Sequence, residues 1–236
     1  MANTSSQPFI RLYESSDKAN LVRVFRETAD KSVQIEPICT IGSHIWCLPY
    51  VTLSPKTCFV LDDGKGKAVG YCIGTPDTAD LAGRWRSEFL PTIEQDLRTL
   101  PLPEDVSKEE GKKAQAKRDE LCDGIYNNPQ SLVHGDFAEQ LKAYPGHLHI
   151  DILPSHQRLG FGKKLVDKFL ASLKEAGCTG LYLGMVAGNS DAARFYEREG
   201  FYRLPHVLDG GASGEQGRTK GDGGAGGGVI YFVREL

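Results

Sequence analysis

The stretch HQRLGFGKKL, residues 156–165, places two glycines and several cations where a strand-like run gives way to a helix-like one. A helix that begins after a glycine turn directs unpaired backbone N–H groups, and the positive end of its dipole, at an anion. Gly160 and Gly162 let the backbone approach such an anion without a Cβ in the way. Arg158 and Lys163 add positive charge. This arrangement predicts a phosphate-binding turn.

The spacing of the glycines narrows the phosphate ligand. A Walker loop needs a glycine five residues before Gly162 and Ser or Thr after the lysine, but the chain has Gln157 and Lys164 there. The dinucleotide pattern G-x-G-x-x-G needs a glycine where the chain has Leu165. Both loops are excluded, and the motif that fits is Q-x-x-G-x-G, from Gln157 to Gly162.

Two further segments carry polar side chains toward the same turn. In HLHIDIL, residues 147–153, strand alternation puts His149 and Asp151 on one face. A polar row is unusual on a central strand, so we expect it to line a cleft. In NSDAARFYEREGF, residues 189–201, helical spacing places Asn189, Ala192 and Tyr196 on roughly one face.

The Q-x-x-G-x-G turn and the following N-x-x-A-x-x-x-Y-x-x-x-G-F element together resemble the GNAT superfamily of N-acetyltransferases. The resemblance implies an α/β (α+β) fold, with a mixed central sheet of about seven strands flanked by helices. It also implies acetyl-CoA as co-substrate. The residues implied to bind it are Ile152, Leu153, Gln157, Arg158, Leu159, Gly160, Phe161, Gly162, Lys163, Asn189, Ala192 and Tyr196.

A narrower likeness lies in three short stretches: W-x-x-x-F-L-P at residues 85–91, AYP at 143–145 and D-I-x-P at 151–154. They resemble the acetyltransferase-like domain of eukaryotic O-GlcNAcases and its stand-alone bacterial relatives. By analogy of fold, an amino sugar such as glucosamine is then the first acceptor to test.

The GNAT resemblance implies direct attack of an amine on the thioester, without an acyl-enzyme, so no cysteine nucleophile is expected. It implies that Tyr196 is the acid for the departing thiolate, and that backbone N–H groups near Ile152 and Leu153 hold the carbonyl and the pantetheine. Asp151 or His149 can serve as the base, directly or through water. Asp151 can instead only orient a histidine or a loop. The weaker candidates for the base are Glu36, His44, His134 and Asp136.

Hydrophobic periodicity and turn residues predict a single domain, residues 1–236, with a helical insert between the third and fourth strands at about 77–146. A glycine-rich loop at about 209–228, with ten glycines between 210 and 228, is predicted to be flexible. The expected strands are 8–14, 57–63, 67–75, 147–153, 180–186, one from 201 and 228–236, and the expected helices outside the insert are 15–30, 41–53, 160–176 and 190–199.

Composition excludes several function classes. The net charge of −3 gives no global basic field for nucleic acid or an anionic membrane. The N-terminus lacks a signal-peptide pattern and no run has the length of a membrane span, so a cytoplasmic protein is expected. The six scattered cysteines have no metal-site spacing and are expected to be free, mostly buried thiols, with no metal site.

The acceptor has three readings. A small primary amine is the leading one, a protein lysine is the second, and the third is a non-catalytic acetyl-CoA sensor or scaffold that has no acceptor. A homodimer is possible under each reading. Trp46, Tyr50 and Trp85 can form an aromatic wall for such an acceptor, or can be ordinary core aromatics.

Overall fold

The computed structural model describes residues 7–31, 33–100, 108–127, 129, 142–186, 188–204 and 229–236. Its centre is a seven-stranded mixed sheet in the order β1-β2-β3-β4-β5-β7-β6. The prediction of a mixed sheet of about seven strands is therefore confirmed. The strands are β1 (Phe9–Leu12), β2 (Phe59–Asp62), β3 (Ala68–Thr75), β4 (Gly146–Ile152), β5 (Gly180–Val186), β6 (Tyr202–Arg203) and β7 (Val229–Glu235).

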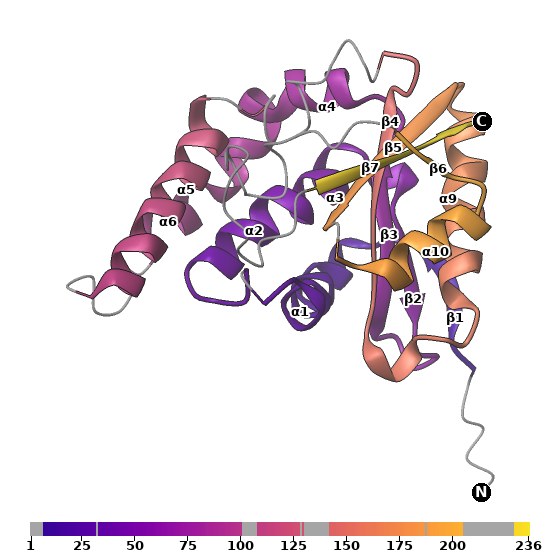
Figure 1. Cartoon of the computed structure of the whole chain (residues 1–236), viewed down its shortest axis with the longest axis horizontal. Helices are drawn as coiled ribbons and strands as arrows, with labels where there is room; N and C mark the ends of the chain where they lie inside the picture. The colour runs from indigo at the N-terminus through magenta and orange to yellow at the C-terminus, as the bar shows by residue number, and fades with distance from the viewer. Residues whose placement is uncertain are drawn as a thin grey trace, which may run out of the picture.

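Helices cover both faces of this sheet. Figure 1 shows α9 on one side and α1 and α2 on the other, and α9 contacts β2, β3 and β4 whereas α1 contacts β3 and β4. The α-helices are α1 (Lys18–Thr28), α2 (Ile38–Trp46), α3 (Leu48–Leu53), α4 (Thr78–Arg84), α5 (Leu90–Arg98), α6 (Glu109–Asn127), α9 (Phe161–Glu175) and α10 (Ser190–Arg198). Three short 3-10 segments are Ser15–Asp17, Pro55–Thr57 and Pro154–His156, and a π-helical turn spans Trp85–Phe89.

The contact of α9 with the sheet follows from its sequence. Its apolar stripe (Leu165, Val166, Phe169, Leu170 and Leu173) is buried, as expected for an amphipathic helix. Gly74 of β3 makes the close approach possible, because a Cβ there would lie 2.7 Å from the Phe169 ring and 2.1 Å from the His147 carbonyl oxygen. The N-terminus of α9 is thereby fixed relative to β4.

The central strand β4 separates the sheet into two parts. It pairs antiparallel with β3 along its whole length, from His147 to Ile152. With β5 it pairs in parallel, and the described pairing is limited to Gly146↔Leu181 and His147↔Tyr182. Beyond these positions the two strands part, which leaves the β5-facing edge of β4 open.

The insert between β3 and β4 carries α4, the π-helical turn, α5 and α6, which confirms a helical insert at this position. Trp85 and Phe89 of the π-helical turn are fully buried and pack edge to face with ring centroids 4.9 Å apart. They are part of the main core. The predicted helix 41–53 is wrong in detail: it is two helices, interrupted at Cys47, whose φ of −130° is not helical.

No helix among the described residues is both long and apolar enough to cross a membrane. The glycine-rich loop at 209–228 lies outside the described residues, so the prediction of its flexibility stays a prediction.

Candidate active site

A pocket of about 580 Å³ lies along the stretch of β4 that β5 no longer pairs, between the N-termini of α9 and α10. Ten predicted site residues line it: Asp151, Ile152, Gln157, Arg158, Gly160, Gly162, Lys163, Asn189, Ala192 and Tyr196. Four do not: His149, Leu153, Leu159 and Phe161. The structure thus brings together segments that are up to 45 residues apart, counted from Asp151 to Tyr196.

The two glycines of the turn have different physical roles. Gly160 is the residue before the first turn of α9 and has φ +80°, a left-handed conformation that favours glycine. A Cβ on Gly160 would meet nothing within 4 Å. A Cβ on Gly162 would instead lie 3.3 Å from the Phe195 ring. Gly160 is needed for backbone conformation, and Gly162 for the close packing of α9 against α10.

The N-terminus of α9 offers the predicted anion site. Its first N–H groups have no partner within the helix, and the helix dipole is positive at this end. Arg158, Lys163 and Arg198 line the pocket beside it. Carboxylates already pair with two of these cations: Arg158 pairs with Asp191, and Lys163 Nζ lies 3.0 Å from an Asp167 and 3.4 Å from a Glu199 carboxylate oxygen. An anionic ligand can therefore take the place of these carboxylates as the partner of the cations.

Two predicted ligand residues also hold the site together. Gln157 Nε2 donates to the Ile152 carbonyl oxygen at 2.7 Å, which ties the turn back to β4. Asn189 Oδ1 accepts from the Ala192 N–H at 3.0 Å and caps α10. Both side chains fix the positions of the segments that line the pocket.

The backbone of β4 corrects one prediction. The Leu153 N–H donates to the Val69 carbonyl oxygen at 2.9 Å, so it is engaged in the ladder with β3 and does not face the pocket. Because successive backbone groups of a strand point to opposite edges, the N–H groups of Ile152 and Ile150 point toward the open β5 side. Ile150 therefore replaces Leu153 as the second backbone donor of this stretch.

Asp151 lies on β4 and is one of the three carboxylates in the pocket lining, with Asp191 and Glu199. Tyr71 Oη donates to Asp151 Oδ2 at 2.5 Å. The Thr28 hydroxyl donates to the Val24 carbonyl oxygen at 2.7 Å and lies near the carboxylate. Burial raises the pKa of Asp151 above its ordinary value, and the Tyr71 hydrogen bond and the nearby Thr28 hydroxyl oppose part of that shift. A carboxylate with a raised pKa is a better proton acceptor than an exposed one.

Tyr196 supplies a phenol on the opposite wall. The residue is buried on α10, where its ring packs against Phe195, Phe201 and Phe232. Burial, with the nearby Asp151 charge, raises the pKa of the Tyr196 phenol. The phenol stays protonated at neutral pH and can donate a proton.

His149 is less suited than Asp151 to the role of base. Its Nε2 lies 3.1 Å from Tyr50 Oη, which also lies 2.6 Å from Nε2 of the buried His147. Burial lowers the pKa of His149 to about 4, so the imidazole is neutral and weakly basic. His149 faces a buried polar cluster and does not line the pocket.

The remaining candidates lie elsewhere. Glu36 pairs with Arg26 at the surface, and His44 is buried in α2. His134 and Asp136 lie outside the described residues. Leu159 is 61% exposed beside the turn, and Phe161 lines a separate groove between α9 and β1.

The prediction that Trp46, Tyr50 and Trp85 form an aromatic wall is wrong for this pocket, since none of the three lines it. Trp85 and Tyr50 are core residues, and Trp46 packs against Phe25 with ring centroids 6.2 Å apart.

All six cysteines are free, and five are buried. Among the described residues, no His, Cys, Asp and Glu side chains cluster as a metal site.

Sequence reasoning missed six lining residues: Thr28, Ile150, Asp191, Phe195, Arg198 and Glu199. Four of them lie in or directly after α10, whose polar face was visible in the helical pattern. Thr28 ends α1, and only tertiary packing brings it to Asp151.

Comparisons with known proteins agree with this geometry. Residues 128–201 match the model of the acetyltransferase (GNAT) family. The protein named SsHAT is 29% identical over 97% of this chain and 98% of its own, with a TM-score of 0.67. A GCN5-related N-acetyltransferase from Kribbella flavida is 14% identical over 97% of this chain and 98% of its own, with a TM-score of 0.51. The likeness to the latter concerns the fold alone.

Proposed function

We propose that this chain is an acetyl-CoA-dependent N-acetyltransferase. It has the GNAT fold, and its residues 128–201 match the GNAT acetyltransferase family model. The acetyl group passes directly from the thioester to a primary amine. The observation that carries this proposal is a single pocket that joins a helix N-terminus, an open strand edge, a partly buried carboxylate and a buried phenol.

Acetyl-CoA fits the described groups. Its diphosphate can bind the unpaired N–H groups at the N-terminus of α9. The cations Arg158, Lys163 and Arg198 match its negative charge. Its pantetheine arm carries two amides, and these can pair with the strand edge at Ile150 and Ile152. Leu159 and Phe161 stay as predicted contacts of the outer part of the coenzyme.

The proposed chemistry uses Asp151 as the proton acceptor and Tyr196 as the proton donor. The amine nitrogen forms a bond to the acetyl carbon as the C–S bond breaks. Asp151 accepts the proton that the nitrogen loses, and Tyr196 donates a proton to the departing thiolate. The raised pKa of Asp151 favours uptake of the proton, and the raised pKa of Tyr196 keeps its phenol protonated until the thiolate forms. In the second reading, Asp151 orients a histidine or a loop and does not take the proton.

The acceptor is inferred from charge. Tyr71 is the hydrogen-bond donor to Asp151 among the described residues, Thr28 lies nearby, and neither is a cation. A substrate ammonium group would supply the missing positive charge. Small primary amines, including amino sugars such as glucosamine, satisfy this requirement, and a protein lysine is the second acceptor class.

A panel experiment tests the proposal. The protein is incubated with acetyl-CoA and a panel of amines (glucosamine, alkylamines and a lysine peptide), while free thiol and acceptor mass are followed. Turnover on one amine, strongly reduced by Tyr196→Phe, is the expected result. Saturable coenzyme binding without turnover on any amine would favour the sensor reading instead.

A further inference from the structure

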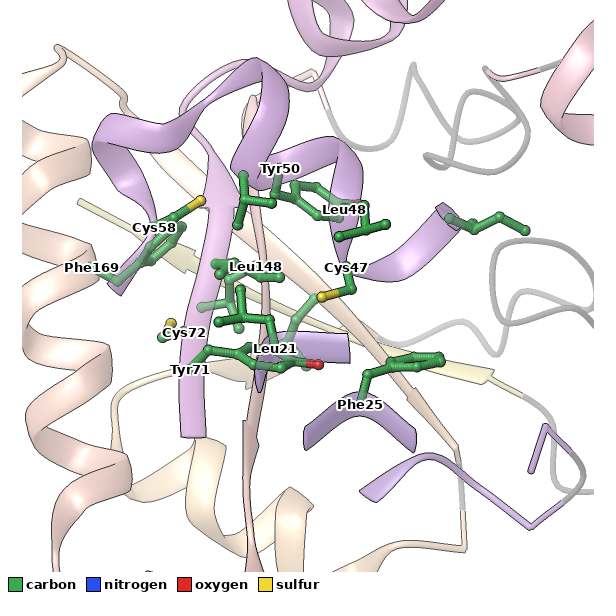
Figure 2. Close-up of a cluster of buried hydrophobic side chains, with 14 of the residues drawn as sticks. Leu21, Phe25, Cys47, Leu48, Tyr50, Cys58, Tyr71, Cys72, Leu148 and Phe169 are labelled. Atoms are coloured by element: carbon green, nitrogen blue, oxygen red, sulfur yellow. The ribbon is translucent and has the colours of Figure 1, made fainter. Parts of the chain in front are cut away.

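Tyr71 lies behind the pocket rather than in it. It is fully buried on β3, directly opposite Asp151 in the β3–β4 register. Figure 2 shows its ring extending from β3 toward the side where Cys47 and Phe25 lie. Its hydroxyl donates to Asp151 Oδ2 at 2.5 Å, although its side chain is not part of the pocket lining.

The protons of this cluster can be assigned from donor and acceptor capacity. A tyrosine hydroxyl has one proton, and the Tyr71 proton is directed to the Asp151 carboxylate. The thiol of Cys47 lies beside the Tyr71 hydroxyl. Burial holds the pKa of both Tyr71 and Cys47 well above their ordinary values, so both keep their protons.

The groups that face Asp151 from neighbouring elements are all neutral at pH 7. They are Thr28 of α1, Cys47 before α3, Tyr71 and Cys72 of β3, and Tyr196 of α10. Burial raises the pKa of each of the four titratable ones, so none carries a charge. With no described cation against it, the ionised carboxylate depends on hydroxyl donors.

We infer that Tyr71 is a positioning residue that holds Asp151 in its ionised form and fixes the orientation of its carboxylate in the pocket. Its effect on the ionisation of Asp151 does not depend on the reaction. Its effect on catalysis rests on the proposed function.

Tyr71→Phe isolates this role, because it removes the hydroxyl and keeps the ring. A hydrogen bond to a charged group corresponds to a shift of about 1–2 pKa units. We expect the pKa of Asp151 to rise by that amount, measured by NMR titration of the ¹³C-labelled aspartate carboxyl carbons, with Asp151→Asn to assign the signal. Tyr182→Phe is the matched control: Tyr182 is buried on the neighbouring strand β5, and its hydroxyl bonds Thr78 rather than Asp151.

A catalytic readout accompanies the titration. If the protein acetylates an amine, the acid limb of its pH–rate profile should move upward in Tyr71→Phe by the same amount as the Asp151 signal. At high pH the variant should recover most of the wild-type rate. Tyr182→Phe should leave the limb in place.

The outcomes separate the two claims. Absence of acetyl transfer by the wild type would remove the proposed function, while the carboxyl titration would still test Tyr71. An Asp151 signal that titrates identically in Tyr71→Phe and the wild type would overturn the inference. Should Tyr71→Phe not fold, the wild type gives a second test: a downfield hydroxyl proton signal must follow the Asp151 titration and vanish in Asp151→Asn, and its absence overturns the inference.

Discussion

Gly160 allows the anion site to be tested by charge alone. Asparagine and aspartate have almost the same shape, and both tolerate the left-handed conformation of this residue. A side chain here extends into open space, since a Cβ meets nothing within 4 Å. Gly160→Asn and Gly160→Asp should therefore share any cost of backbone and bulk. They differ by one negative charge at the N-terminus of α9.

The expected difference follows from Coulomb's law. Two unit charges about 6 Å apart interact by about 0.7 kcal/mol in bulk water and about 2.8 kcal/mol at an effective dielectric constant of 20. Gly160 is exposed, so the interaction with a coenzyme diphosphate lies between these limits. Gly160→Asp should bind acetyl-CoA about 3- to 100-fold more weakly than Gly160→Asn.

Isothermal titration calorimetry at low and high salt measures this difference. Screening should reduce the gap between the two variants at about 1 M salt, where the Debye length is about 3 Å. Thermal unfolding without ligand serves as the control, because the two variants should melt alike. Equal dissociation constants for the two variants at low salt would refute a diphosphate at this turn.

Three further changes test the pocket and the core. Tyr196→Phe should lower kcat by about 100-fold, because it removes the proposed acid, with little change in the acetyl-CoA dissociation constant; an unchanged rate of thiol release would exclude that role. The pKa of Asp151 is raised, so its carboxyl stays protonated to higher pH than usual; the rate should increase with pH through this ionisation, and Asp151→Asn should lack that limb. Arg11→Ala should destabilise the fold by about 3 kcal/mol in urea unfolding, because it leaves the buried carboxylates of Asp17 and Asp62 without their cation; Arg11→Lys should retain part of that stability.

Local pattern predicted those parts of the site that lie within one segment. The glycine turn and the helix after it follow from the spacing of Gly160 and Gly162 and from the apolar stripe of α9. Asn189 and Tyr196 share the pocket because helical spacing puts them on one face of α10. These features depend on residues close in sequence.

The sequence could not predict which backbone N–H groups of β4 point to the open edge of the strand. Alternation shows that neighbouring backbone N–H groups of β4 point to opposite edges, but not which edge stays open. That choice is made by pairing with β3, where Leu153 donates to Val69. The expectation for Leu153 was wrong for this reason, and Ile150 takes its place.

The sequence also could not predict the residues that contact Asp151 from distant parts of the chain. Tyr71 lies 80 residues before the carboxylate that it contacts, and Thr28 comes from another helix. A tyrosine within an apolar strand reads as an ordinary core residue. By contrast, the break at Cys47 that divides α2 from α3 has a local signal, since Pro49 occupies the first turn of α3 and a proline is unfavourable inside a helix.

The short seam between β4 and β5 affects how the protein unfolds. A four-stranded block and a three-stranded block meet at two described pairs of residues, so they are weakly linked as cooperative units. Their amides should exchange with solvent with separate protection levels in the free protein. A ligand that bridges the two strand edges would join the blocks into one unit, so acetyl-CoA binding should be visible as gained folding cooperativity before any acetyl group moves.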